Sequence, residues 1–238
     1  MCQFHIGSHS NLGMEKKTKM KFIHEPYDFP KINRVTTAEG RVYQSPTGEK
    51  YPSITTILSA DKEKKKGIEK WKARVGEAEA KRIVKKAAVR GTSLHTNIEN
   101  YLIEGTYDKS DPFSLFPSVK PFIDKNITKV FNLEAGVYSH RLKAAGTFDC
   151  FAEWGGVPSL IDWKSAKQLK KREWIRTYLW QATFYSMAIW EMKKIKVPQI
   201  VILIGVDHEH PQLFIEKASD YIEPVCAAIK QYHKEHSL

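Results

Sequence analysis

The sequence predicts an α/β (α+β) protein in which a mixed β-sheet is flanked by helices. Residues 144–167 read as two strand-like runs around a Gly-Gly pair, the pattern of a β-hairpin. Residues 199–207, QIVILIGVD, form a β-branched run typical of a strand buried on both faces. Helix-forming segments lie before the hairpin, between these strands and at the end of the chain. Together they indicate one layered sheet.

The hairpin pattern also fixes a register. Both central positions of a type I′ turn need a positive φ, so Gly155 and Gly156 are expected to form a two-residue loop. Trp154 then pairs with Val157, and opposed residues have numbers that sum to 311. Pro158 falls where its missing N–H removes no bond from the hairpin.

In this register two acids oppose each other. Asp149 is expected to face Asp162, at about 4.5 Å between Cα atoms, and Thr147 to face Lys164 on the same side. Two carboxylates this close repel each other, and Lys164 supplies one charge against two. A divalent cation compensates, and oxygen ligands suit Mg²⁺ or Mn²⁺. The alternative is an ordinary hairpin with solvated charges on one face.

Length and charge narrow the class of protein. The chain has 238 residues, is 42% hydrophobic and carries a net charge of +11. This length suffices for one substantial domain, expected over residues 22–238. The positive surplus favours DNA or another nucleic acid as the partner. An anionic membrane is the competing interpretation, but the sequence has no lipid-anchor motif and no apolar run near membrane-spanning length.

Residues 1–21 are expected to form a disordered polar tail. They lack the apolar core of a signal peptide, and Glu15 with the absence of arginine argues against a mitochondrial transit peptide. The three cysteines of the chain match neither a disulfide framework nor a zinc site. We therefore expect a cytoplasmic protein that is not secreted, in the host cytoplasm if the chain is phage-encoded, with no membrane partner and no small-molecule organic cofactor.

Two motifs in the hairpin resemble a known family. GTFD ends at Asp149, and DWK begins thirteen residues later at Asp162. This spacing resembles the PD-(D/E)XK nuclease superfamily, in particular its RecB-like branch with the mitochondrial genome maintenance and phage-encoded exonucleases. The resemblance covers about residues 51–207, although Phe148 stands where the superfamily has a proline. It implies a restriction-endonuclease-like fold, Asp149 and Asp162 as metal ligands, and Lys164 as a catalytic residue.

The resemblance extends to a helix earlier in the chain. His95 follows Gly91 by four residues, as in the RecB-like helix motif, which implies that His95 reaches the metal site. Glu99 lies one turn further on, where it either orients His95 or is a surface acid. Glu134 resembles a family acid that precedes the GTFD strand, and could carry a second metal or hold a base.

A later helix, within residues 169–194, carries the motif Tyr-x-x-Gln-x-x-x-Tyr. A buried amide must find partners, so Gln181 is out of place in an apolar stripe. The resemblance implies that Gln181 and Tyr185 line the active site; otherwise the stripe is core. The candidate phosphate contacts between hairpin and helix are Lys167, Lys170, Lys171 and Arg172.

The segment YPSITTIL resembles a Pro-Ser-Val-Thr signature of the family. The resemblance implies that the hydroxyls of Ser53 and Thr55 lie near DNA. The alternative is a helix N-cap, a role that serine and threonine commonly fill.

The expected function is that of a metal-dependent DNA exonuclease that prefers single-stranded ends. A structure-specific endonuclease of the same fold and a non-catalytic nucleic-acid-binding protein remain the alternatives. The catalytic candidates are Asp149, Asp162, Lys164, His95 and Gln181; the metal-ligand candidates are Asp149, Asp162 and His95; the supporting candidates are Glu99, Glu134, Tyr185 and Thr147.

Overall fold

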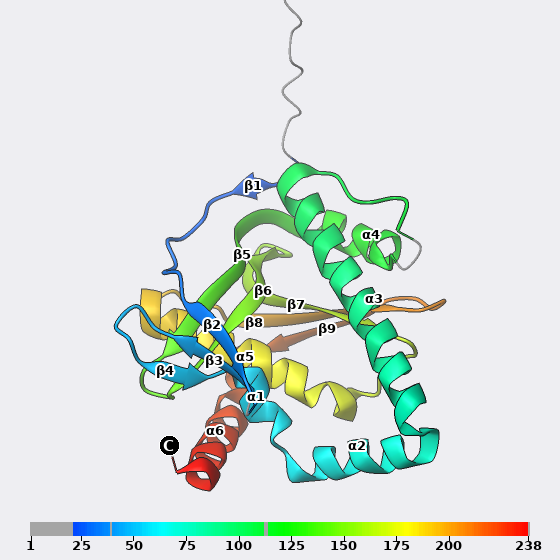
Figure 1. Cartoon of the computed structure of the whole chain (residues 1–238). Helices are drawn as coiled ribbons and strands as arrows, with labels where there is room; N and C mark the ends of the chain where they lie inside the picture. Colours follow the sequence, from blue (N-terminus) through cyan, green and yellow to red (C-terminus); the bar gives the residue numbers. More distant parts are fainter. Residues whose placement is uncertain (1–20, 39, 112–113, 238) are drawn as a thin grey trace, which may run out of the picture.

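The computed structural model describes residues 21–38, 40–111 and 114–237, with the side chains of residues 62–64 left out. A six-stranded mixed sheet lies between helices, with strand order β1-β5-β6-β7-β8-β9 (Figure 1). The predicted fold class is confirmed. The predicted tail, residues 1–21, lies outside the described residues apart from Lys21.

The sheet combines parallel and antiparallel pairs. β1 runs parallel to β5, β7 runs parallel to β8, and the other neighbours are antiparallel. The strands are β1 (Ile23–His24), β5 (Ile127–Ser139), β6 (Ala144–Trp154), β7 (Val157–Ala166), β8 (Gln199–Val206) and β9 (Gln212–Lys217).

Helices cover both faces of the sheet. α1, α5 and α6 share one hydrophobic core with it, and the second half of α3 shares another with α4. The helices are α1 (Ile54–Ser59), α2 (Lys62–Val75), α3 (Glu77–Glu104), α4 (Phe116–Asn126), α5 (Arg176–Lys193) and α6 (Ile222–His236), with 3₁₀ turns at Arg172–Ile175 and Ala218–Tyr221. The sequence alone favours a helix over residues 119–130, but α4 ends at Asn126, because the β-branched run that begins at Ile127 enters β5.

β8 is buried on both faces, as predicted. Ile200, Ile202 and Ile204 belong to the core with α5, whereas Val201 and Leu203 belong to the core with α3 and α4. Burying each of these side chains contributes about 1.5–3 kcal/mol to folding. β8 thereby anchors β7, which carries part of the candidate site.

The hairpin turn forms as the glycines predict. Gly155 and Gly156 have φ angles of 60° and 80°. Trp154 pairs with Val157, in the register whose numbers sum to 311. Pro158 faces Glu153, also as expected.

Beyond the middle of the hairpin the two strands separate. Their pairing ends at Cys150 and Ile161, so the expected direct pair of Asp149 with Asp162 does not form. The carboxylate of Asp149 instead accepts a hydrogen bond of 2.9 Å from the backbone N–H of Trp163. This side-chain bond takes the place of a ladder bond, and β7 continues beside β8 alone.

A second, three-stranded sheet lies against α1. It consists of β2 (Asn33–Thr37), β3 (Gly40–Gln44) and β4 (Lys50–Pro52). The turn-rich sequence of this region predicts short strands at residues 33–37 and 41–44, and β2 and β3 confirm them. Gly40 has a φ of 131°, and a Cβ there would lie 2.6 Å from Cγ2 of Thr56. Glycine is therefore required for β3 to approach α1 this closely.

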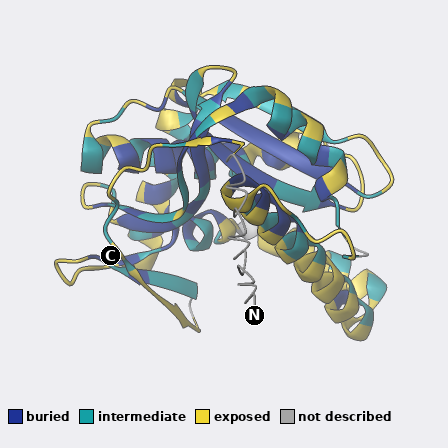
Figure 2. Ribbon diagram, turned by 90° about the horizontal axis from the view of Figure 1, so that it is seen from above, coloured by how far each residue is buried: buried dark blue, intermediate teal, exposed yellow. Residues whose placement is uncertain are grey.

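α2 and the first half of α3 project from the body of the protein. They meet at Gly76, whose φ of 84° breaks the helix where the sequence predicts a break. Figure 2 shows this pair of helices largely exposed. No helix in the described part of the chain is both long enough and apolar enough to cross a bilayer.

Candidate active site

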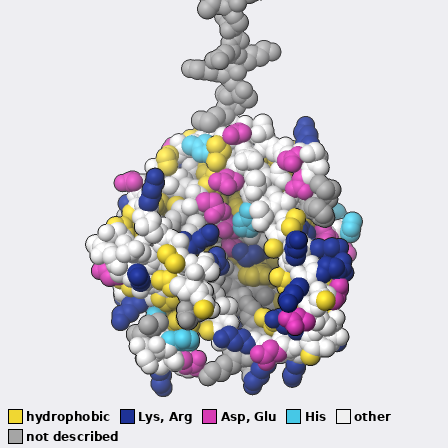
Figure 3. All heavy atoms as spheres, viewed as in Figure 1, with side chains coloured by type: hydrophobic (Ala, Val, Ile, Leu, Met, Phe, Trp, Pro, Cys, Tyr) yellow, Lys and Arg dark blue, Asp and Glu magenta, His cyan; other side chains and the backbone are white. Residues whose placement is uncertain are grey.

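A polar cavity of about 260 Å³ lies where α3, α5 and the small sheet meet β5, β6 and β7. Figure 3 shows acidic and histidine side chains close together near the centre of one face, beside a hollow with Lys and Arg side chains around it. The structure thus brings together predicted residues from six elements. The cavity is lined by His95, Glu134, Thr147, Asp149, Lys164, Gln181, Tyr185, Ser53, Thr55, Arg34, Arg41, Tyr43 and Gly146.

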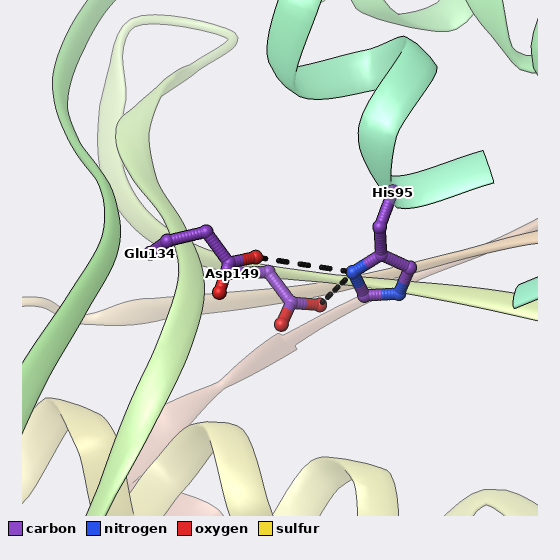
Figure 4. Close-up of side chains that lie close together, drawn as sticks. All are labelled: His95, Glu134 and Asp149. Carbon is purple, nitrogen blue, oxygen red and sulfur yellow. Dashed lines mark ion pairs between the residues drawn. The ribbon is translucent and has the colours of Figure 1, made fainter. Parts of the chain in front are cut away.

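Three of these side chains converge as a possible metal-binding group. His95, Glu134 and Asp149 each offer one ligand atom, and these atoms lie within 4.8 Å of one another (Figure 4). Nδ1 of His95 lies 3.7 Å from Oδ2 of Asp149 and 4.0 Å from Oε1 of Glu134. Carboxylate oxygens with one imidazole suit Mg²⁺ or Mn²⁺.

A backbone carbonyl orients His95. Nε2 lies 2.9 Å from the carbonyl oxygen of Trp163, so Nε2 carries the proton and donates to that oxygen. The lone pair of Nδ1 then faces the two acids. Burial lowers the pKa of His95, but attraction by Glu134 and Asp149 outweighs it, so the pKa is raised above 6.5.

Glu99 does not orient His95. The Trp163 carbonyl occupies the ring nitrogen that a second partner would take, and no contact between Glu99 and His95 is found among the described residues. This orienting group could not be read from side-chain types, because a backbone oxygen supplies it.

Glu134 reaches the site through an uncommon backbone conformation. Its φ is 46°, in the left-handed region that costs a non-glycine residue about 1–3 kcal/mol. Ala135 pairs with Phe148 in the ladder between β5 and β6. The preceding residue, Glu134, therefore lies opposite Asp149.

Asp162 lies beneath this group. The residue is 3% exposed, and within the described part of the chain neither carboxylate oxygen has a partner in hydrogen-bonding geometry. Nζ of Lys164 lies 2.5 Å from Oδ2 as an ion pair. Burial raises the pKa of Asp162 to about 6, with repulsion from Asp149 adding to the shift and Lys164 opposing it. Glu134, rather than Asp162, belongs to the group of three that could hold a metal ion, and Asp162 as a ligand stays a prediction.

Lys164 is held as a cation. Burial lowers its pKa, but Asp162 and Asp149 outweigh that effect and raise the pKa above its ordinary value. Its Nζ also lies 5.2 Å from the ring centroid of Tyr178. Lys164 can therefore stabilise negative charge, and deprotonating it to make a base would be costly.

Gln181 and Tyr185 line the cavity as a bonded pair. The side-chain amide of Gln181 donates to the Tyr185 hydroxyl over 3.1 Å. A Cβ at Gly146 would lie 2.7 Å from Cε1 of Tyr185, so the tyrosine depends on glycine at that position. Burial raises the pKa of Tyr185 well above its ordinary value, which keeps the hydroxyl protonated.

The two hydroxyls of the YPSITTIL segment have different partners. Ser53, only 1% exposed, accepts from the backbone N–H of Thr56 and caps α1, which confirms the N-cap alternative. Thr55 accepts a hydrogen bond of 2.7 Å from Nη2 of Arg41. Thr55 thereby helps to hold Arg41 at the cavity.

Sequence reasoning did not identify Arg34, Arg41 and Tyr43. They reach the cavity on β2 and β3, and no motif marks them. Thr147, expected to face Lys164, instead has its hydroxyl 3.3 Å from the hydroxyl of Tyr43. Side chains alternate between the two faces along these short strands, and this alternation could have indicated the three residues. It becomes informative only once the strands are placed beside the hairpin.

The predicted phosphate contacts lie outside the cavity. Lys167, Lys170 and Lys171 line a neighbouring groove with Trp174. Arg172 is engaged within the protein, because its Nη1 lies 2.6 Å from Oε1 of Glu216.

Comparisons with known proteins find a sequence relative and structural neighbours of this chain. No family model matches the chain. The chain is 29% identical to mitochondrial genome maintenance exonuclease 1 of Homo sapiens over 130 residues, which are 50% of this chain and 38% of that protein. It thus spans well under half of that relative. A crystal structure described as an exonuclease from Eubacterium rectale superposes with a TM-score of 0.40 and 12% identity, over 62% of this chain and 66% of that one, a likeness too slight to carry an argument.

Proposed function

We propose that this chain is a metal-dependent deoxyribonuclease of the PD-(D/E)XK type that acts as an exonuclease on single-stranded DNA ends. The observation that carries the proposal is the group of His95, Glu134 and Asp149 beside a buried Asp162–Lys164 pair. The similarity to a human protein named as an exonuclease supports the same activity.

The donor set fits a divalent cation. Glu134, Asp149 and His95 would hold it, with Asp162 close enough to influence it through charge. Asp162 is buried with Lys164 as its ion-pair partner, and no hydrogen bond satisfies its Oδ1 among the described residues, which indicates negative charge that the protein alone does not fully compensate. A bound cation would polarise the scissile phosphodiester and lower the pKa of a water molecule that attacks it.

The remaining cavity residues supply orientation and charge. Lys164 would stabilise the negative charge that develops on the phosphate, because it is held protonated beside Asp162. Arg41 and Arg34 line the same cavity and would contact phosphates on either side of the cleaved bond. The bonded Gln181–Tyr185 pair would fix the position of the strand.

The proposed DNA substrate is supported by the net charge of +11. A groove of about 930 Å³ runs between the exposed half of α3 and the ends of β7 and β8. Within it Arg82 pairs with Glu79 and Arg90 pairs with Asp207, so Lys86 and Lys167 are the side chains left to contact phosphates. The small volume of the catalytic cavity favours one strand over a duplex.

The test is incubation with 5′- and 3′-labelled single strands, duplexes and circles, in Mg²⁺, Mn²⁺ or EDTA. We expect stepwise release from one end of single strands, only with metal, and none from Glu134→Gln or Asp149→Ala. Asp28→Ala is the matched control, because Asp28 is exposed and lines none of the cavities described above. Cleavage of circles would identify an endonuclease instead. Metal-independent binding of DNA without any cleavage would identify a non-catalytic binding protein.

A further inference from the structure

A second cavity, of about 970 Å³, lies at the opposite end of β8 and shares no lining residue with the catalytic cavity. The last turns of α5 form one wall, and the start of α6 with the turn before it forms another. Its volume lies within the range of binding pockets, about 300–1,000 Å³.

The inner surface of this cavity is apolar and partly open to solvent. Trp190 is 47% exposed and Ile222 is 42% exposed. Leu142, Met187 and Val197 complete the apolar surface. Large apolar side chains left exposed around one hollow are typical of an interaction site, whereas single exposed ones are not.

The rim of the cavity is basic. Arg141, Lys194, Lys196 and Lys217 line it, against Glu191 as the one acid among its lining residues. The carboxylate of Glu191 is engaged within the protein, accepting from the Ser139 hydroxyl at 2.5 Å and from the backbone N–H of Arg141 at 3.2 Å. The charge presented to a partner is therefore positive.

We propose that this cavity docks an acidic segment of a partner protein, with one or two large apolar side chains inserted and Asp or Glu residues against the rim. Trp190 is the one aromatic side chain among the lining residues of this cavity, and Leu142, Met187 and Ile222 beside it fit peptide side chains better than stacked bases. Residues 1–20 of this chain are an unsuitable occupant, because they carry Lys16, Lys17 and Lys19 against Glu15. A second copy, at a net charge of +11, is disfavoured for the same reason.

The proposal is independent of the nuclease assignment. Trp190 and the rim cations lie outside the catalytic cavity, so their replacement should leave cleavage of a labelled single strand unchanged. Loss of catalysis in the Glu134→Gln variant should in turn leave docking unchanged. The two proposals can therefore fail separately.

The experiment measures fluorescence polarisation of short labelled peptides that carry four aspartates and a Leu-Phe pair at three different spacings. We expect saturable binding of at least one peptide, lost when Asn replaces each aspartate or Ser replaces the Leu-Phe pair. Trp190→Ala should weaken binding by at least about tenfold, as for an aromatic hot spot. The double variant Lys196→Glu, Lys217→Glu should weaken it about threefold to tenfold and flatten its salt dependence.

Matched controls separate the site from general effects. Trp174→Ala removes an equally exposed tryptophan elsewhere, and Lys230→Glu reverses an exposed charge that does not line this cavity. Both should keep wild-type affinity. Absence of binding by all three peptides would overturn the proposal. Two other results would also overturn it. One is that a short oligonucleotide displaces the peptide and itself binds the double variant more weakly than the wild type. The other is that the wild type forms a dimer and Trp190→Ala dissociates that dimer.

Discussion

Replacing Asp162 with asparagine tests the electrostatics of the site without any substrate. The carboxylate is buried and its pKa is raised to about 6, because burial penalises the charged form and, together with repulsion from Asp149, outweighs the attraction of Lys164. An aspartate in the unfolded chain titrates near about 3.9. Asparagine has nearly the same shape and no charge to bury.

The sign of the effect follows from these two pKa values. The native state binds the proton more tightly than the unfolded state does, so this stabilisation is complete below about pH 3.9 and lost as the pH rises through about 6. Between about pH 5 and 8, the wild-type free energy of unfolding should fall by about 1.4 kcal/mol relative to Asp162→Asn. For a chain of this size that corresponds to about 3–5 °C in Tm.

Thermal unfolding in EDTA at several pH values is the assay, and the difference between the two proteins is the quantity of interest. The variant also leaves Lys164 without its acid, but Lys164 stays protonated across this range, so that effect is a constant offset. Asp162 also raises the pKa of His95, so both proteins are compared in a His95→Ala background. Asp220→Asn, at an exposed position, should run parallel to the wild type.

A divalent cation should reverse the difference in the free energy of unfolding between the wild type and Asp162→Asn. A cation that binds only the native state stabilises it by about 2.7 kcal/mol at a hundredfold excess over Kd. The wild type should gain more from Mn²⁺ than Asp162→Asn does. Parallel pH profiles in EDTA would refute the reasoning, because Asp162 would then carry no uncompensated buried charge.

The remaining predictions concern the residues around it. Glu134→Gln should lower cleavage at least about a hundredfold while DNA binding in EDTA stays within about twofold; near-normal cleavage would remove Glu134 from the site. His95→Ala should reduce activity in Mg²⁺ and abolish the loss of activity that wild type shows as the pH falls below the raised His95 pKa; an unchanged pH–rate profile would argue against His95 as a ligand. Gly146→Ala should displace Tyr185 and cost about 1–3 kcal/mol by thermal unfolding, and a wild-type Tm would mean that the tyrosine moves freely. Arg41→Ala should reduce the slope of log affinity against log salt for single strands by about 0.7, and an unchanged slope would place the phosphates elsewhere.

The parts of the fold that the sequence predicts well are those set by local chemistry. Two adjacent glycines dictate the turn, and the β-branched run of β8 has few alternatives to a buried strand. The position of His95 was available only through resemblance to a family. Nothing in the periodicity of α3 indicates that this residue, among many polar ones, points at the hairpin.

Other features of the site depend on competition between side-chain and backbone hydrogen bonds. The expected pairing of Asp149 with Asp162 assumed that the ladder would continue, but a carboxylate can accept from a backbone N–H and end the ladder. Glu134 was a candidate whose register could not be fixed, because its left-handed φ is not a preference that glutamate signals. Arg34 and Arg41 depend on how a small sheet docks, which is a tertiary property.

The charges of the assembled site imply an order of binding. Glu134, Asp149 and Asp162 bring three carboxylates to one place, against Lys164 and His95, which is a cation only when protonated. Without a divalent cation the three ionised carboxylates leave this group with two negative charges, or one when His95 is protonated, so it would repel a phosphate even though the surrounding surface attracts DNA. We therefore infer that the lysines around the site hold the strand first without regard to metal, and that the strand end enters the cavity only once the carboxylates are compensated. A cleavage-inactive Lys164→Ala variant should thus bind single strands with or without Mn²⁺, yet protect the terminal nucleotides from chemical footprinting only with Mn²⁺. Equal protection in EDTA would show that the arginines of the small sheet overcome the acids on their own.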